Sequence, residues 1–232
     1  MKRDAIDDFG SYPFSIPAIR QLDELMLDPH VTLFAGENGS GKSTLVEAIA
    51  VAAGFNAEGS SRNVTVSTRA SHSPLHKHLR LVRGTRRPKT GYFLRAESFF
   101  NVATYIEDLR DPGITAAYGG KLHEKSHGES FISLVTHRFG PNGLYILDEP
   151  EAALSLRGNL ALIRRMHDLV AEGSQFVVST HSPILLGYPG ATIYVLSADG
   201  IAQTAYEETE VVELTRSFLQ DRAKFLHHLF EN

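Results

Sequence analysis

The stretch that decides the fold reads Gly36-Glu37-Asn38-Gly39-Ser40-Gly41-Lys42-Ser43, and Thr44 follows it directly. It fits the phosphate-binding pattern G-x-x-x-x-G-K-[ST] at every fixed position. A short apolar run over 31–35 predicts a buried strand before the loop, and residues 43–53 predict the helix that leaves it. Strand, loop and helix therefore occur in the order that a nucleoside triphosphate cradle requires. The alternative is a Gly-rich turn in which the G-K-S letters are accidental.

The residue types of this loop suit the chemistry of a bound triphosphate. Glycines let the backbone turn sharply and direct its N–H groups inward at the phosphates. Lys42 adds a positive charge near the β and γ phosphates, and the Ser43 hydroxyl is a ligand for Mg²⁺. We therefore expect the residues from Gly36 to Thr44 to contact a nucleotide and its metal ion.

Composition places the chain among ordinary globular proteins. Of its 232 residues 42% are hydrophobic and 22% are charged, which fits a single α/β domain over residues 1–232. No apolar run approaches the roughly 18 residues that a membrane-spanning helix needs. The first residues lack the apolar core of a signal peptide, and the absence of cysteine excludes disulfides and thiolate metal sites. We expect a cytoplasmic location.

The net charge of −4 hides one basic segment. Residues 55–95 contain nine lysines and arginines and one acidic residue, Glu58, so the rest of the chain is strongly acidic. A basic segment of this kind favours a phosphate-rich partner such as nucleic acid. A solvated basic loop is an alternative of equal weight.

The regions on either side of the loop give weaker predictions. Tyr12 precedes the loop on a segment that could present its ring to the adenine face, although core or edge packing is the alternative. Alternating apolar residues predict an antiparallel β insertion with strands at 63–68, 79–83 and 91–95. The insertion also contains His72, His76 and His78, to which we assign no role because they lack acidic neighbours.

A helical part is predicted over 96–140. Its first helix covers 96–110 and stops at Asp111-Pro112-Gly113, and an irregular loop follows over 114–127. A second helix starts near Gly128. Ser126 and the free N–H groups around Gly128 would form an anion-binding site at that helix start.

A second nucleotide motif follows the helical part. The continuous apolar run 144–147 leads directly into Asp148-Glu149-Pro150, which suits a Walker B strand. A buried parallel strand would bring Asp148 beside the phosphate loop, where its carboxylate holds Mg²⁺ through water. Glu149 would polarise the attacking water as general base. The alternative is a strand that ends in two surface acids.

The remaining sequence adds a further candidate residue. Residues 159–171 predict a helix and 174–180 a buried strand that ends at His181. A histidine at this position could hydrogen-bond the γ-phosphate and sense its loss, and a purely structural histidine is the alternative. A hairpin over 192–206 and a final helix to about residue 230 complete the chain.

The order of these motifs resembles that of the ATP-binding cassette (ABC) ATPases. The chain contains four motifs in the order found in the soluble branch of this family, which includes SMC, RecF-like and OLD-like ATPases and small AAA-type ATPases. These motifs are the phosphate loop, Ser126-His127-Gly128-Glu129, Leu147-Asp148-Glu149-Pro150 and Ser179-Thr180-His181. The resemblance implies ATP and Mg²⁺ as ligands, and an ABC-ATPase-like P-loop fold: a three-layer sandwich with a mainly parallel central sheet. It also implies that Ser126 and Gly128 of one copy bind the γ-phosphate held by a second copy. The chain is thus expected to form an ATP-dependent homodimer.

Several positions depart from the family pattern. In the L-S-G-G-Q/E signature, Lys125 replaces the leucine and His127 the first glycine, and Ser155 stands where transporters have an aspartate. No glutamine follows the strand at 91–95, where Glu97 or Ser98 is the substitute. Arg62 resembles an arginine that SMC-like ATPases place near the nucleotide, although any exposed arginine would look the same.

Two functions follow from this resemblance. The first is an ATPase with Lys42, Glu149 and His181 as catalytic residues. Its ATP-driven dimerisation would do mechanical or signalling work. Nucleic acid bound by residues 55–95 is one hypothesis for its partner. The alternative is the nucleotide-binding subunit of a membrane transporter. The weak signature and the missing glutamine favour the first. An ATP-dependent clamp without turnover is a third possibility, against which Glu149 argues.

Overall fold

The computed structural model of the protein describes residues 1–57, 59–61, 73–85, 87–97, 99, 104, 108, 111–120, 124 and 126–231. At the centre of these residues is a seven-stranded sheet with the order β2-β3-β4-β5-β1-β6-β7. The strands are β1 (Val31–Gly36), β2 (Ser60–Ser61), β3 (Thr90–Arg95), β4 (Gly143–Asp148), β5 (Gln175–Ser179), β6 (Thr192–Ser197) and β7 (Gly200–Gln203).

The sheet is parallel in its centre and antiparallel at both edges. Strands β3, β4, β5, β1 and β6 run in one direction, whereas β2 pairs antiparallel with β3 and β7 antiparallel with β6. The predicted α/β class with a mainly parallel sheet is therefore confirmed. Because parallel strands end at the same edge, the residues that follow β1, β4 and β5 lie close together.

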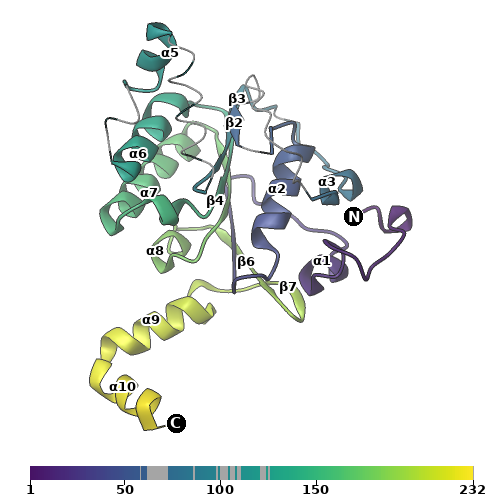
Figure 1. Cartoon of the computed structure of the whole chain (residues 1–232), viewed down its shortest axis with the longest axis vertical. Helices are drawn as coiled ribbons and strands as arrows, with labels where there is room; N and C mark the ends of the chain where they lie inside the picture. Colours follow the sequence, from purple (N-terminus) through teal and green to yellow (C-terminus); the bar gives the residue numbers. More distant parts are fainter. Residues whose placement is uncertain are drawn as a thin grey trace.

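Helices cover both faces of this sheet, which gives the expected three layers (Figure 1). One face carries α1 (Pro17–Gln21), α2 (Lys42–Ala52) and α3 (Leu75–His78). The other carries α6 (His127–Arg138), α7 (Leu156–Ala171) and α8 (Pro183–Leu186). Three short 3-10 helices, η1 (Arg3–Ala5), η2 (Pro150–Ala153) and η3 (Tyr206–Glu208), and the helix α5 (Pro112–Ala117) lie in the connections.

The apolar residues of the inner strands divide between the two faces. In β1, Leu33 belongs to the core beneath α6 and α7, and its neighbour Phe34 to the core beneath α1 and α2. In β4, Leu147 and Ile146 divide in the same way. Successive side chains of a strand point to opposite faces, so a strand buried on both faces must be apolar throughout. This is why these strands read as unbroken apolar runs in the sequence.

Two predicted segments differ from the structure. Residues 79–83 form no strand: Leu79 and Leu81 pack against the core beneath α1 and α2, but no described strand pairs with their backbone. The predicted strand at 63–68 lies outside the described residues. The predicted loop at 114–127 begins with α5, since Pro112 takes the first helical position and Asp111 accepts a hydrogen bond from the Gly113 N–H at 2.7 Å. Asp-Pro-Gly therefore starts a helix inside the predicted loop, and most of the helix predicted over 96–110 lies outside the described residues.

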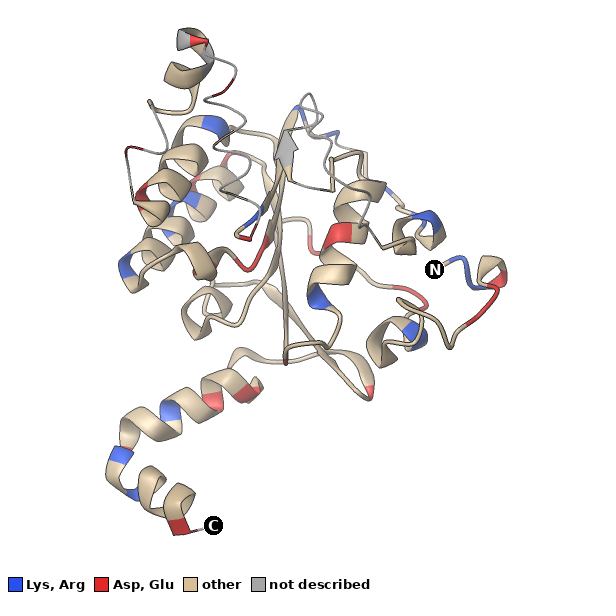
Figure 2. Cartoon of the chain, in the orientation of Figure 1, with Lys and Arg blue, Asp and Glu red and all other residues tan. Residues whose placement is uncertain are grey.

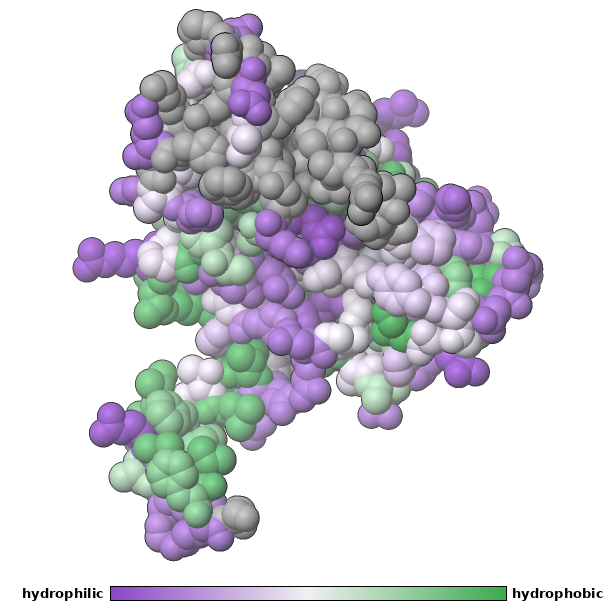
Figure 3. Space-filling model, viewed as in Figure 1, coloured by the Kyte–Doolittle hydropathy of each residue, from purple (hydrophilic) through white to green (hydrophobic). Residues whose placement is uncertain are grey.

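The C-terminal residues form an arm that projects from the sheet (Figure 1). We name α9 (Glu210–Gln220) and α10 (Arg222–Glu231) together the C-terminal arm. The sequence predicts one continuous helix here, but the structure has two helices separated by Asp221. Acidic residues lie at the start of α9 and basic ones around the break (Figure 2). Val212 is buried in α9, and no described residue of α10 is, so the arm shows a largely apolar surface (Figure 3).

Among the described residues, no helix has both the length and the apolar character that crossing a membrane would require.

Candidate nucleotide site

The phosphate loop connects β1 to α2, as predicted. Gly36, Gly39 and Gly41 all have positive φ, at 139°, 80° and 100°. A Cβ at Gly36 would lie 2.3 Å from the Leu196 carbonyl oxygen, and one at Gly41 would lie 2.9 Å from Ile16. Glycine is therefore required at both ends of the loop, by backbone conformation and by space.

Lys42 is the first residue of α2 and lies over the loop. Its Nζ donates hydrogen bonds to the carbonyl oxygens of Gly36 and Glu37, each at 2.8 Å, and the residue is 3% exposed. Burial lowers the pKa of its ammonium, and the nearby carboxylates of Glu149 and Asp148 partly offset that effect. A buried cation at this place suits an anionic ligand that enters the loop.

Asp148 ends β4 and lies beside the end of β5. Its Oδ1 accepts a hydrogen bond from the Ser179 Oγ at 2.5 Å, and the residue is buried. Glu149 follows with left-handed backbone angles (φ 50°, ψ 52°), which cost a non-glycine residue about 1–3 kcal/mol. Its N–H donates to the Ser179 carbonyl oxygen at 3.0 Å, which holds the turn in place.

His181 follows β5 and meets Glu149. The distance from His181 Nε2 to Glu149 Oε1 is 3.5 Å. The His181 N–H donates to Glu151 Oε1 at 2.5 Å, and burial raises the pKa of the Glu151 carboxyl. The structure thus brings Lys42, Asp148, Glu149 and His181 together at the carboxyl ends of three adjacent strands. We call these four residues the Walker cluster.

Polar atoms without partners gather around this cluster. Nine buried side-chain polar atoms have no hydrogen-bond partner in the described chain, and four of them belong to the phosphate loop or to residues at the cluster: Ser40 Oγ, Arg95 Nε, Glu151 Oε2 and His181 Nε2. Buried polar groups of native proteins are nearly always satisfied. Unpaired donors and acceptors at one place are the expected property of a site that receives a polar ligand.

The residues also fit a magnesium ion. Ser43 is the second residue of α2 and Asp148 ends β4, so a hydroxyl and a carboxylate lie at the same edge of the sheet. Mg²⁺ takes oxygen ligands and is commonly held by one or two protein groups together with phosphates and water. No group of three or more histidine, aspartate or glutamate side chains forms a separate metal cluster in the described part of the chain.

Tyr12 lies near the start of α2. Its hydroxyl is 3.2 Å from the Thr44 Oγ1, and the residue is 62% exposed. Core packing is therefore excluded for this ring, and it stays a candidate for stacking on a base. Arg62, the other candidate contact from the N-terminal half, lies outside the described residues.

Ser126 and Gly128 stand apart from the cluster in their contacts. Ser126 caps α6: its Oγ accepts from the Glu129 N–H at 3.4 Å and its own N–H donates to Glu129 Oε2 at 2.9 Å. The Ser126 Oγ also donates to that carboxylate at 2.7 Å. A Cβ at Gly128 would lie 3.2 Å from the Ala153 carbonyl oxygen, so α6 starts close to the turn after Glu149.

Arg95, Glu47 and Glu151 were not predicted as site residues. Arg95 ends β3 beside Asp148 and contacts Glu47 of α2 and Asp148. In the sequence, Arg95 is one of the nine basic residues of the segment 55–95. Its place at the carboxyl end of a strand next to β4 is the signal that could have found it. Glu97, expected as a glutamine substitute, is exposed and lies 3.8 Å from Arg95, and Ser98 lies outside the described residues.

Known proteins match this chain in part. Residues 5–107 match the family model described as AAA domain, a stretch that contains β1, the phosphate loop and α2. This match agrees with the expected P-loop ATPase. No curated protein matches the chain in sequence.

Two solved structures show partial similarity to this chain. The SMC head domain from Thermotoga maritima is 15% identical, with 78% of this chain and 92% of that chain covered and a TM-score of 0.43. A nucleotide-free ATP-binding cassette from an ABC transporter is 19% identical, with 82% and 85% covered and a TM-score of 0.44. At these identities and scores the likeness carries no assignment of function.

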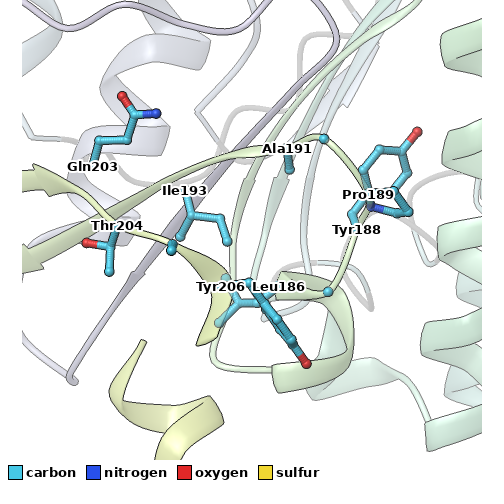
Figure 4. A pocket seen from close by; sticks show the side chains of 11 residues that line it. Leu186, Tyr188, Pro189, Ala191, Ile193, Gln203, Thr204 and Tyr206 are labelled. Atoms are coloured by element: carbon cyan, nitrogen blue, oxygen red, sulfur yellow. The ribbon is translucent and has the colours of Figure 1, made fainter. Parts of the chain in front are cut away.

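A hollow of about 810 Å³ lies elsewhere in the P-loop domain (Figure 4). It is bounded by α8 and the β6–β7 hairpin, and Leu186, Ile193 and Tyr206 line it. Ile193 pairs with Leu33 in the middle of β1, and the hollow continues toward the start of β6, away from the end of β1 where the loop begins. It is therefore separate from the Walker cluster.

Proposed function

We propose that this protein binds ATP with Mg²⁺ and hydrolyses it, and that two copies enclose the nucleotides between them. The observation that carries the proposal is the convergence of Lys42, Asp148, Glu149 and His181 at one edge of the sheet, next to a loop whose glycines have positive φ. A P-loop ATPase domain agrees with the family match.

Each residue of the cluster has a role in this proposal. Lys42 and the loop N–H groups bind the β and γ phosphates. Ser43 and Asp148 hold Mg²⁺, which neutralises charge on the phosphate oxygens when bound. Glu149 accepts a proton from a water whose oxygen attacks the γ phosphorus, while the bond to the bridging oxygen breaks and ADP leaves.

His181 would act beside Glu149. With 3.5 Å between His181 Nε2 and Glu149 Oε1, the imidazole can orient the base or donate to the γ-phosphate. The hydrogen bond from the His181 backbone N–H to Glu151 holds the backbone of His181 in place after β5. These contacts support a role for His181 in distinguishing ATP from ADP.

The second copy enters through Ser126 and Gly128. The described hydrogen bonds of Ser126 are made with Glu129 and Ser130 of its own helix, so its contacts give no support to a role at the phosphate loop of the same chain. The start of α6 is exposed, and the N-terminal end of a helix suits an anion held by another molecule. This supports the proposal of a composite site.

The experiment compares wild-type protein with Glu149→Gln. We expect the variant to bind ATP and Mg²⁺ as wild type does, to release phosphate at a rate reduced about 100-fold or more, and to elute as a dimer with ATP. Glu172→Gln, an exposed carboxylate at the end of α7, is the matched control. Undiminished hydrolysis would overturn the role of Glu149, and a monomer with ATP bound would overturn the enclosure.

Other parts of the sequence interpretation stay hypotheses. The transporter-subunit alternative predicts that the protein copurifies with a membrane protein. For nucleic acid, the described residues of the basic segment include exposed Arg80, Arg83 and Arg87, whereas Arg95 points into the site. The cytoplasmic location and the single domain also stay predictions.

A further inference from the structure

Arg95 lies between two buried carboxylates that belong to different elements. Its Nη1 is 2.8 Å from Glu47 Oε2 on α2, and its Nε is 3.4 Å from Asp148 Oδ2 on β4. The Glu47 and Asp148 side chains are 11% and 6% exposed. Glu97 also lies within 3.8 Å, but its side chain is 90% exposed and solvent screens that pair.

The two contacts of Arg95 are unequal. The contact with Glu47 is a hydrogen bond between charged groups, whereas Arg95 Nε makes no hydrogen bond in the described chain. Asp148 is therefore near the guanidinium without being firmly held by it. Charge-assisted hydrogen bonds are the stronger kind, so Arg95 has its firmer partner in Glu47.

Glu47 is a fixed anion on the helix that starts at the phosphate loop. It follows Ser43 by four residues, so both side chains lie on one face of α2. The second oxygen of Glu47 accepts a hydrogen bond from the Ser73 N–H at 3.2 Å. Its position is thus held independently of Arg95.

We propose that Arg95 is a positioning residue that balances the charge of Asp148 in the metal-free protein and keeps only its bond to Glu47 when Mg²⁺ takes Asp148. Cation and guanidinium compete for one carboxylate, and Glu47 keeps the displaced charge paired. This inference rests on the proposed function, because it requires nucleotide and Mg²⁺ at the Walker cluster. Under this proposal, Glu47 and Arg95 together set the Mg²⁺ concentration at which the metal binds to Asp148.

The proposal predicts opposite effects for the two partners. Without Arg95, Asp148 has lost a competing positive charge, so Mg²⁺ should bind more readily. With Glu47→Gln, Arg95 loses its alternative partner and stays on Asp148, so Mg²⁺ should bind less readily. The glutamine keeps an acceptor for the Ser73 N–H.

The test measures binding of a fluorescent ADP analogue as Mg²⁺ is added, and records the Mg²⁺ concentration at half of the full change. We expect Arg95→Met to lower this concentration about tenfold and Glu47→Gln to raise it about threefold. Arg165→Met is the control, because Arg165 is a half-buried arginine that bonds the Phe139 carbonyl oxygen away from the site. It should stay within about twofold of wild type. Melting temperatures without nucleotide establish that each variant is folded.

The possible results are distinguishable. If Arg95→Met and Glu47→Gln both melt at lower temperature but keep the wild-type Mg²⁺ dependence, Arg95 only stabilises the fold. The proposed competition between Arg95 and Mg²⁺ for Asp148 is then overturned. A shift in the same direction for both variants overturns it as well. If wild-type protein does not bind the analogue at any Mg²⁺ concentration, the proposed function fails, and the proposed competition fails with it.

Discussion

The Walker cluster and the start of α6 use their polar groups in opposite ways. In the cluster, Lys42, Glu149 and His181 come from three separate elements and converge on one place, with unpaired polar atoms around them. At the start of α6, Ser126 and Glu129 satisfy each other in a capping box. One region is arranged for a ligand of the same chain, and the other is complete without one.

We expect the Walker cluster to be needed for nucleotide binding, and the start of α6 to be needed for ATP turnover. A region whose groups converge within one chain should bind nucleotide as a monomer. A region that is locally satisfied and exposed contributes only when another molecule approaches it. We therefore expect variants of the first region to lose nucleotide affinity, and variants of the second to lose turnover while affinity is kept.

The largest effect is expected for Lys42→Ala. Removing a buried cation from the phosphates should weaken ATP affinity about 100-fold, because the phosphate charge would be left unpaired. Isothermal titration of ATP with Mg²⁺ measures this, and Lys89→Ala, an exposed lysine just before β3, is the control. An affinity within about threefold of wild type would contradict the role of Lys42.

A substitution at Ser126 tests the second region. Ser126→Asp keeps a residue suited to the helix start but adds a negative charge that repels phosphate, so we expect turnover to fall about 30-fold with unchanged monomer affinity. Ser126→Asn is the neutral control with a comparable capping side chain. Mixing Ser126→Asp with Lys42→Ala protein should restore part of the activity, since one composite site then has both intact halves. No recovery in the mixture would contradict a site shared between copies.

Tyr12 tests the edge of the first region. If its ring stacks on adenine, Tyr12→Ala should weaken ATP affinity about tenfold, within the range of about 1–3 kcal/mol found for a base on an aromatic ring. Tyr12→Phe keeps the ring and loses only the contact with Thr44, so it should stay near wild type. Equal affinities for all three proteins would show that the ring takes no part in binding.

Glu151 gives the smallest expected effect, on stability. Burial raises its folded pKa above the unfolded value, so the folded protein binds more protons and loses stability as pH rises through the range between them. Glu151→Gln keeps an acceptor for the His181 N–H and removes the charge. We expect it to raise the melting temperature by about 2–4 °C at pH 7 and by less at pH 4.5, as about 1 kcal/mol would do in a domain of this size. An equal change at both pH values would contradict this.

The sequence predicts most of the first region because its signals are local. The phosphate loop needs glycine at fixed backbone positions, and buried parallel strands have mostly apolar centres, so the strands expected at 31–35, 144–147 and 174–180 are confirmed as β1, β4 and β5. Asp148 and His181 could then be placed together, since both follow inner strands.

The rest depends on contacts that no local pattern contains. Arg95 reads as one more arginine of a basic segment until β3 is placed beside β4. Leu79 and Leu81 alternate as in a strand, but alternation only indicates which side chains are buried, and no strand among the described residues pairs with them. Likewise, the helix break at Asp221 lacks a glycine or proline that would indicate it.

The C-terminal arm affects how self-association of this chain must be interpreted. Leu219, Leu229 and Phe230 are 74%, 60% and 77% exposed, and contact between two arms would remove this apolar area from water at high protein concentration. Dimers formed in that way would need no nucleotide, whereas dimers closed by ATP would form only when the ligand is present. A dilution series with and without ATP would therefore separate two kinds of pairing that a single chromatogram would merge.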